Sequence, residues 1–144
     1  MNNAPSFDAV FQDIENKNIL VVTTTWNKDF LAPAIEEIAL HAKEEKINMA
    51  VKFCPGSLEL AATIKRTLKN AEFDGVIALG LVIKGDTPHF KLVSRQTFHD
   101  LGKVALDFEA VPLINGVLTV DNKVQAEERI CLLYTSDAAD DRCC

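Results

Sequence analysis

The sequence lacks several features that mark common classes of protein. It contains no apolar run near the ~20 residues that a membrane-spanning helix requires, and its first residues carry acidic side chains instead of a basic start followed by an apolar block. Positive charge is also scarce, because 15 Lys and Arg oppose 21 Asp and Glu, a formal net charge of -6. We therefore expect a cytoplasmic protein with no membrane partner and no nucleic-acid partner.

Cysteine is present, but not in a pattern that builds a site. Cys54 and Cys131 stand alone in the sequence, and Cys143 and Cys144 are adjacent at its end. This spacing matches neither a metal site nor a disulfide framework, so we expect no bound metal. Cys54 is expected to be a small buried residue.

Four apolar, β-rich segments alternate with segments of helical period. The strands are predicted at residues 18–24, 49–53, 75–83 and 111–120, and the helices at residues 29–46, 58–68, 93–108 and 124–130. The run Ile19 to Val22 is continuous, which is typical of a strand covered on both faces. Repeated alternation predicts parallel strands with right-handed crossovers. We expect one three-layer α/β domain, flavodoxin-like, with a four-stranded parallel sheet in strand order 2-1-3-4.

Polar loops follow the predicted strands, at the edge where such sheets bind ligands. In the loop after the second strand, Ser57 is placed to cap a helix by accepting a backbone N–H. The loop 84–90 holds a glycine, a hydroxyl and a histidine directly after a buried strand. Backbone N–H groups near Gly85 can face an anion, and the imidazole of His89 can donate or accept a proton. An isolated Gly-x-Thr-Pro-His is, however, only a surface turn in most proteins.

The stretch Leu79 to Phe90, LGLVIKGDTPHF, resembles the lumazine synthase signature, Leu-Gly-x-Val-Ile-Arg-Gly-x-Thr-x-His-Phe. Three further motifs occur in the order of that family: Trp26-Asn27 after the first strand, residues 55–60 after the second, and residues 115–119 together with 125–129. The match runs from about Ile19 to Ile130. Four separate motifs in the right order make the resemblance specific.

The resemblance implies a transferase of riboflavin biosynthesis. Lumazine synthases condense 5-amino-6-(D-ribitylamino)uracil with 3,4-dihydroxy-2-butanone 4-phosphate to give 6,7-dimethyl-8-ribityllumazine, releasing phosphate and water. This reaction needs neither a metal nor a redox cofactor. The resemblance also implies a homopentamer with the active site between subunits, a decamer or 60-mer in some members, and riboflavin synthase as a further partner.

The same resemblance assigns roles to individual residues. By that assignment His89 transfers protons; the pyrimidine and its ribityl chain contact Trp26, Asn27, Ser57, Leu58, Glu59, Leu81, Val82, Ile83 and Asn115; and the phosphate contacts Gly85, Asp86, Thr87 and Arg129. An indole is suited to stacking on a pyrimidine, and a guanidinium is suited to binding phosphate. The carboxylate of Asp86 is expected to point away from the phosphate.

Simpler interpretations exist for several of these residues. Trp26 could be a partly buried core residue, and Asn27 could be only a helix cap. Glu59 is also a favourable acid for the first turn of a helix, and Arg129 alone would be a solvated helix residue. Asn115 occupies a position where many family members have a phenylalanine that lines a neighbouring subunit's site, and a hydrogen bond to the pyrimidine is the alternative role.

The two ends of the chain are set apart from the predicted domain. We expect residues 1–130 to form the lumazine synthase-like domain, with residues 1–17 as an N-terminal arm. After Ile130 the family continues with a Lys-Gly element and a long alanine-rich helix. Residues 131–144 instead resemble translated sequencing-adapter sequence, and we expect a disordered or artefactual tail outside the family.

Two other functions are compatible with the expected fold. A non-catalytic lumazine- or flavin-binding protein, or a shell-forming assembly protein, would use Trp26 while His89 stays idle. A flavodoxin-like electron carrier would also bind its ligand at the strand ends. The first loop disfavours the carrier, because residues 23–27 lack a glycine-rich phosphate turn.

Overall fold

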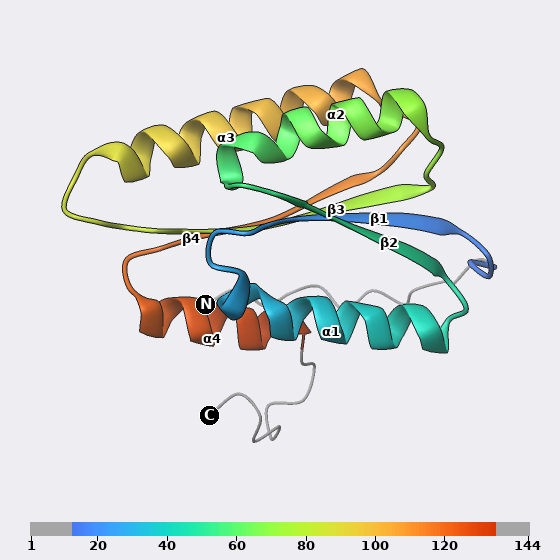
Figure 1. Ribbon diagram of the computed structural model, residues 1–144, viewed down its shortest axis with the longest axis horizontal. Helices are drawn as coiled ribbons and strands as arrows, with labels where there is room; N and C mark the ends of the chain where they lie inside the picture. Colours follow the sequence, from blue (N-terminus) through green and yellow to red (C-terminus); the bar gives the residue numbers. More distant parts are fainter. Residues whose placement is uncertain (1–12, 135–144) are drawn as a thin grey trace, which may run out of the picture.

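The computed structural model describes residues 13–134, which form a three-layer α/β domain (Figure 1). In chain order the elements are β1 (Asn18–Thr24), α1 (Lys28–Glu44), β2 (Asn48–Cys54), the 3-10 turn η1 (Ser57–Glu59), α2 (Leu60–Asn70), β3 (Gly75–Ile83), α3 (His89–Asp107), β4 (Leu113–Val120) and α4 (Lys123–Tyr134). All the strand pairs are parallel, and the order is β2-β1-β3-β4. The predicted flavodoxin-like α/β fold and its strand order are therefore confirmed.

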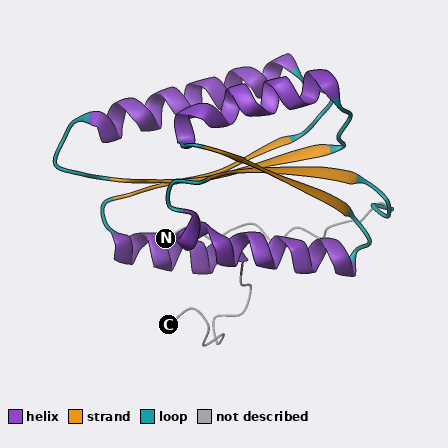
Figure 2. Ribbon diagram, in the orientation of Figure 1, coloured by secondary structure: helices purple, strands orange, loops and turns teal. Residues whose placement is uncertain are grey.

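Each face of the sheet is covered by a pair of helices (Figure 2). Helices α2 and α3 lie on one face, where Leu20, Val22 and Ile64 belong to a buried cluster. Helices α1 and α4 lie on the other face, where Leu31 and Ala126 belong to a second cluster. Burying a leucine or isoleucine side chain contributes about 1.5–3 kcal/mol relative to leaving it exposed, so both clusters stabilise the layers.

The strands do not end together, and this opens the sheet at its carboxyl edge. β1 pairs with β3 only as far as Val22 opposite Ala78. β3 continues beside β4 as far as Ile83 opposite Val120. Within the described chain, residues 79–83 therefore have no strand partner on the β1 side, although β1 stays paired with β2 as far as Thr24 opposite Cys54.

The backbone groups of β3 alternate between its two sides. The N–H of Lys84, directly after β3, donates to the carbonyl of Val120 on β4 at 2.8 Å. With the two-residue period of a strand, the backbone of Val82 also faces β4, whereas Leu81 and Ile83 face the opposite side. Leu81 and Ile83 thus have backbone groups directed into the opening between β3 and β1.

Several predicted boundaries were wrong, among them the start of the fourth strand, the start of the third helix and the end of the last helix. β4 begins at Leu113 rather than at residue 111, because Pro112 has no N–H for the ladder. Helix α3 begins at His89, so the histidine lies in the first helical turn and not on the predicted loop. Pro88 precedes it with φ near -69°, which suits the entry to a helix. Helix α4 continues to Tyr134, beyond the predicted end at residue 130.

The described residues leave out both ends of the chain. Residues 1–12 of the predicted arm and 135–144 of the predicted tail lie outside the described residues. Between residues 13 and 134 no helix has both the length and the apolar character needed to span a membrane.

Candidate active site

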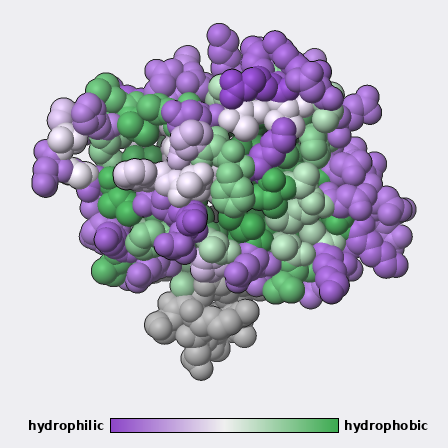
Figure 3. All heavy atoms as spheres, viewed as in Figure 1, coloured by the Kyte–Doolittle hydropathy of each residue, from purple (hydrophilic) through white to green (hydrophobic). Residues whose placement is uncertain are grey.

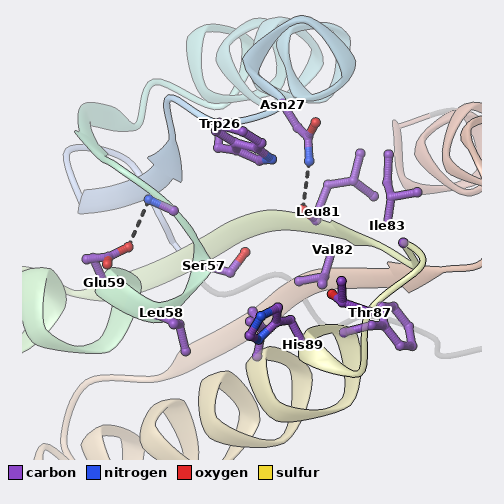
Figure 4. A pocket seen from close by; sticks show the side chains of 14 residues that line it. Trp26, Asn27, Ser57, Leu58, Glu59, Leu81, Val82, Ile83, Thr87 and His89 are labelled. Carbon is purple, nitrogen blue, oxygen red and sulfur yellow. Dashed lines mark hydrogen bonds between the residues drawn. The ribbon is translucent and has the colours of Figure 1, made fainter.

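A pocket of about 420 Å³ lies in the opening at the carboxyl edge of the sheet (Figure 4). Its walls come from the loop after β1, the turn after β2, the end of β3 and the start of α3. The lining residues are Trp26, Asn27, Gly56, Ser57, Leu58, Glu59, Leu81, Val82, Ile83, Gly85, Thr87, His89, Phe90 and Val93. The volume is typical of a small-molecule site.

Trp26 extends over the pocket from the loop after β1. Its backbone is held on both sides: its N–H donates to the Pro55 carbonyl at 3.0 Å, and the Thr24 hydroxyl donates to its carbonyl at 2.6 Å. The residue is nevertheless 74% exposed, which excludes the core interpretation. Figure 4 shows the indole on the opposite side of the pocket from His89, so one wall offers an aromatic face and the other an imidazole.

Asn27 does not cap α1 with its side chain. It occupies the N-cap position with a left-handed backbone, φ 61° and ψ 23°, but makes no side-chain capping hydrogen bond. Its amide instead donates to the carbonyl of Leu81 on β3 at 2.9 Å. The loop after β1 is thereby joined to the strand that forms the floor of the pocket.

The turn after β2 is built differently from the sequence prediction. Ser57 was expected to cap the helix, but the N-cap position is Gly56, and the carboxylate of Glu59 accepts a hydrogen bond from the Gly56 N–H at 3.0 Å. Ser57 is only 9% exposed and packs toward the sheet. A carboxylate suits this N–H because it lies at the positive end of the helix.

Gly80 makes room for this turn, and the sequence analysis missed it. A Cβ atom at Gly80 would lie 2.8 Å from the Ser57 hydroxyl oxygen and 3.2 Å from a methyl group of Leu60. The lack of a side chain therefore lets the turn come close to β3. A glycine inside a strand is a known sign of close approach by another segment, and that signal was present in the sequence.

Cys54 lies at the end of β2, below the turn, and is buried as predicted. Burial raises the pKa of its thiol; a hydrogen bond with Thr63 lowers it, and the charge of Glu59 raises it further. The sulfur lies 3.5 Å from the carbonyl oxygen of Gly56, to which the thiol donates. The raised pKa favours the protonated thiol, which is a poor nucleophile. The hydrogen bond from this thiol to Gly56 instead supports the turn.

The loop between β3 and α3 is exposed and polar. Gly85 and Thr87 line the pocket beside His89, whereas Asp86 does not. A Cβ atom at Gly85 would meet nothing within 4 Å, and the residue does not have a positive φ. The fold itself thus does not require a glycine at position 85. The missing side chain leaves open space on the side of the loop that faces the pocket.

The structure does not bring two of the predicted residues into this pocket. Asn115 lies in the middle of β4, opposite Ala78, and its side-chain oxygen accepts a hydrogen bond from the N–H of Val117 at 2.9 Å. Arg129 is exposed on α4 and is also outside the lining. No group of three or more potential metal-ligating side chains occurs among residues 13–134.

The fold and the pocket define a class of protein: an α/β domain with a pocket of small-molecule size at the carboxyl edge of a parallel sheet. The sequence model for 6,7-dimethyl-8-ribityllumazine synthase matches residues 16–140. The chain belongs to this family, whose members are transferases of riboflavin biosynthesis.

Two curated relatives with the same name show the extent of the similarity. The 6,7-dimethyl-8-ribityllumazine synthase of Leuconostoc mesenteroides subsp. mesenteroides is 34% identical over 127 residues, which cover 85% of this chain and 80% of the relative. The synthase of Gemmatimonas aurantiaca is 36% identical over 129 residues, which cover 88% of this chain and 78% of the relative. The match to the family model over residues 16–140 includes every segment that lines the pocket.

Proposed function

We propose that this chain condenses 5-amino-6-(D-ribitylamino)uracil with 3,4-dihydroxy-2-butanone 4-phosphate in the pocket at the carboxyl edge of its sheet. The observation that carries the proposal is the placement of Trp26 and His89 on opposite walls of one pocket whose floor is β3. Membership of the family agrees with it. The products are 6,7-dimethyl-8-ribityllumazine, phosphate and water.

The pyrimidine substrate fits the side of the pocket nearer to Trp26. Its ring stacks on the exposed indole, and its polar edge meets the backbone of Leu81 and Ile83. Its ribityl hydroxyls reach the turn with Ser57 and Glu59, where hydroxyl, carboxylate and backbone groups supply both donors and acceptors. Leu58 and Val82 contribute apolar lining to the same region.

The phosphate of the second substrate fits the loop between β3 and α3. Open space at Gly85 and the hydroxyl of Thr87 face the pocket there, and successive backbone N–H groups can bind phosphate oxygens. Asp86 takes part only through its backbone. In this proposal the leaving phosphate lies beside His89.

Arg129 and Asn115 act in the pocket of a neighbouring copy in this proposal. Both side chains are outside the pocket of their own chain. Self-association is supported by apolar side chains on the two edge strands: Phe53 is 56% exposed on β2, and Ile114 is 61% exposed on β4. Figure 3 shows apolar residues gathered between the helix layers, over the edge formed by β2. A homopentamer, alone or within a decamer or 60-mer, is the assembly that we propose.

Positioning supplies most of the rate enhancement. The amine of the pyrimidine attacks the ketone, water leaves, phosphate is eliminated, and ring closure releases a second water. Holding two reactants together can supply about 7–11 kcal/mol, whereas one acid-base residue typically contributes about 10²- to 10⁴-fold. His89 moves protons in these steps, and the walls of the pocket align the reactants.

The test is formation of lumazine from both substrates, followed by its absorbance. His89→Ala should lower kcat by about 10²- to 10⁴-fold without abolishing turnover. His99→Ala is the matched control, because His99 is exposed on the same helix and outside the pocket. Unchanged kcat in His89→Ala, or equal losses in both variants, would contradict the role of His89.

A binding protein without turnover is the second candidate, because the exposed indole of Trp26 can stack on a lumazine or flavin without any part for His89. In that case the folded chain would bind the product tightly and form none from the two substrates. A cytoplasmic location and an encounter with riboflavin synthase, which would use the product, belong to the enzymatic proposal.

A further inference from the structure

We propose that Asn27 is a positioning residue: it fixes the indole of Trp26 above the pocket by hydrogen bonding to the Leu81 carbonyl. The inference rests on the proposed function, because it concerns how the pyrimidine is held. Its basis is the 2.9 Å hydrogen bond from the Asn27 amide to the Leu81 oxygen, which joins positions 54 residues apart.

The hydrogen bond replaces a missing strand partner. The pairing of β1 with β3 ends at Val22 and Ala78, so the Leu81 carbonyl points toward a side of β3 from which β1 has departed. A backbone carbonyl without a partner in a partly buried place is costly. The amide of Asn27 satisfies it and at the same time sets the distance between the loop after β1 and the floor of the pocket.

The backbone of Asn27 adds a second constraint. Its φ of 61° lies in the left-handed region, which asparagine tolerates better than most residues do. Its carbonyl accepts the N–H groups of Phe30 and Leu31 at 3.1 and 3.3 Å, so α1 starts from this residue. Because Trp26 directly precedes Asn27, the direction of the indole depends on how Asn27 is held.

The same hydrogen bond affects what the floor of the pocket can recognise. The Leu81 carbonyl is occupied by Asn27, so Leu81 retains its N–H as the group available to a ligand. An N–H donor matches a carbonyl oxygen on the edge of a uracil ring. Asn27 therefore favours a ring with an acceptor at that edge while it fixes the aromatic wall above it.

Two substitutions separate the hydrogen bond from the backbone conformation. Asn27→Gly keeps the left-handed backbone but removes the amide. Asn27→Asp keeps the size but replaces the donor with an acceptor facing the Leu81 oxygen. Asn48→Asp is the matched control, since the Asn48 amide also donates to a backbone carbonyl, that of Asn16 at 3.3 Å, but lies outside the pocket lining.

Trp26 provides a direct readout, because it is the only tryptophan in the sequence. In the free protein, both Asn27 variants should lower the fluorescence anisotropy of the indole, because it moves more freely, whereas Asn48→Asp should not. With substrates, KM for the pyrimidine should rise about tenfold, which corresponds to a loss of about 1.4 kcal/mol, while KM for the keto-phosphate should stay within about twofold.

The outcomes separate the inference about Asn27 from the proposed function on which it rests. If folded Asn27→Gly leaves the indole signal and KM for the pyrimidine unchanged, Asn27 does not position Trp26. A lower melting temperature with both KM values unchanged would show a role in stability alone and would also overturn the inference. If the indole signal changes but the wild-type chain neither binds the pyrimidine nor forms lumazine, then the proposed function fails and the structural role of Asn27 stands.

Discussion

The glycines of this protein have different roles. The contacts that an added Cβ atom would make at each position distinguish these roles. At Gly80 a Cβ atom would collide with Ser57, and at Gly116 it would lie 2.8 Å from a methyl group of Leu79. At Gly102, inside α3, it would meet nothing within 4 Å. The same residue type therefore permits close packing at the first two positions and only weakens a helix at the third.

We predict opposite effects for two identical substitutions. Gly80→Ala should lower the free energy of unfolding by about 1–3 kcal/mol, because the added methyl group forces the turn away from β3. Its KM for the pyrimidine should also rise, since Ser57 lines the pocket. Gly102→Ala should raise the free energy of unfolding by about 0.4–1 kcal/mol. Urea denaturation measures both, and a shift of equal sign in the two variants would contradict this explanation.

Cys54 should make stability fall at alkaline pH. Burial raises the pKa of its thiol in the folded state, so the folded chain holds the proton more tightly than the unfolded chain does. The contribution of the protonated thiol to folding stability is therefore complete below the pKa of an unfolded cysteine, about 8.5. It is lost as the pH rises through the higher pKa of the folded state. Cys54→Ala should flatten the decline in melting temperature above pH 8.5; an unchanged slope would exclude this cause.

Residues directly after strands were the ones that sequence reasoning placed well. Trp26, Ser57 and Thr87 meet at one edge because the carboxyl ends of parallel strands all lie on that side of the sheet. The partner of Asn27 could not be predicted, since its hydrogen bond depends on where β1 leaves β3 and not on any local pattern. Whether Arg129 contacts phosphate also depends on more than one chain, and it stays a prediction.

At the scale of elements, the start of the second helix depends on one carboxylate. Glu59 accepts the Gly56 N–H and also lines the pocket. The hydroxyl of Thr63, in the first turn of α2, donates to the Glu59 carbonyl at 2.8 Å. The turn is thus held by the side chain and the backbone of the same residue.

Glu59→Ala and Glu59→Gln should therefore differ in stability. The alanine variant loses the acceptor for the Gly56 N–H and should lose about 0.5–2 kcal/mol of unfolding free energy. The glutamine variant keeps an oxygen acceptor and should lose less than half as much, although both should bind the ribityl chain more weakly. Thermal unfolding and KM for the pyrimidine test this, and equal losses of stability would show that the hydrogen bond to Gly56 is unimportant.

Element types were predictable from hydrophobic periodicity, whereas several ends were not. The continuous apolar runs of β1 and β3 identify strands covered on both faces. The sequence prediction starts α3 too late because proline is common in loops, although the φ of Pro88 suits the residue before a helix. The prediction of Ser57 as the cap misses the spacing of Gly56 and Glu59, at which the carboxylate of the third helical residue accepts the N-cap N–H.

At the scale of the whole molecule, exposed apolar residues lie on both edge strands. Phe53 on β2 and Ile114 on β4 are each more than half exposed. An isolated monomer gains nothing from this arrangement, and open sheet edges with apolar side chains favour association.

Charge at these positions should weaken self-association. Phe53→Lys and Ile114→Lys should each raise the dissociation constant at least about tenfold, because burying an unpaired lysine costs several kcal/mol. Glu36→Lys, at an exposed position on α1, is the control. Light scattering after size exclusion gives the mass; wild-type protein that is monomeric at all concentrations would contradict the proposed assembly.

The early departure of β1 from β3 also creates two populations of backbone amides in one strand. Amides of β3 that face β4 are held by the ladder and should exchange their hydrogens with solvent only when the sheet opens. The amides of Leu81 and Ile83, which face the pocket, have no such protection in the free protein. A bound pyrimidine would protect these two amides directly, so occupancy of the site can be followed at single amides, without turnover and without altering any side chain.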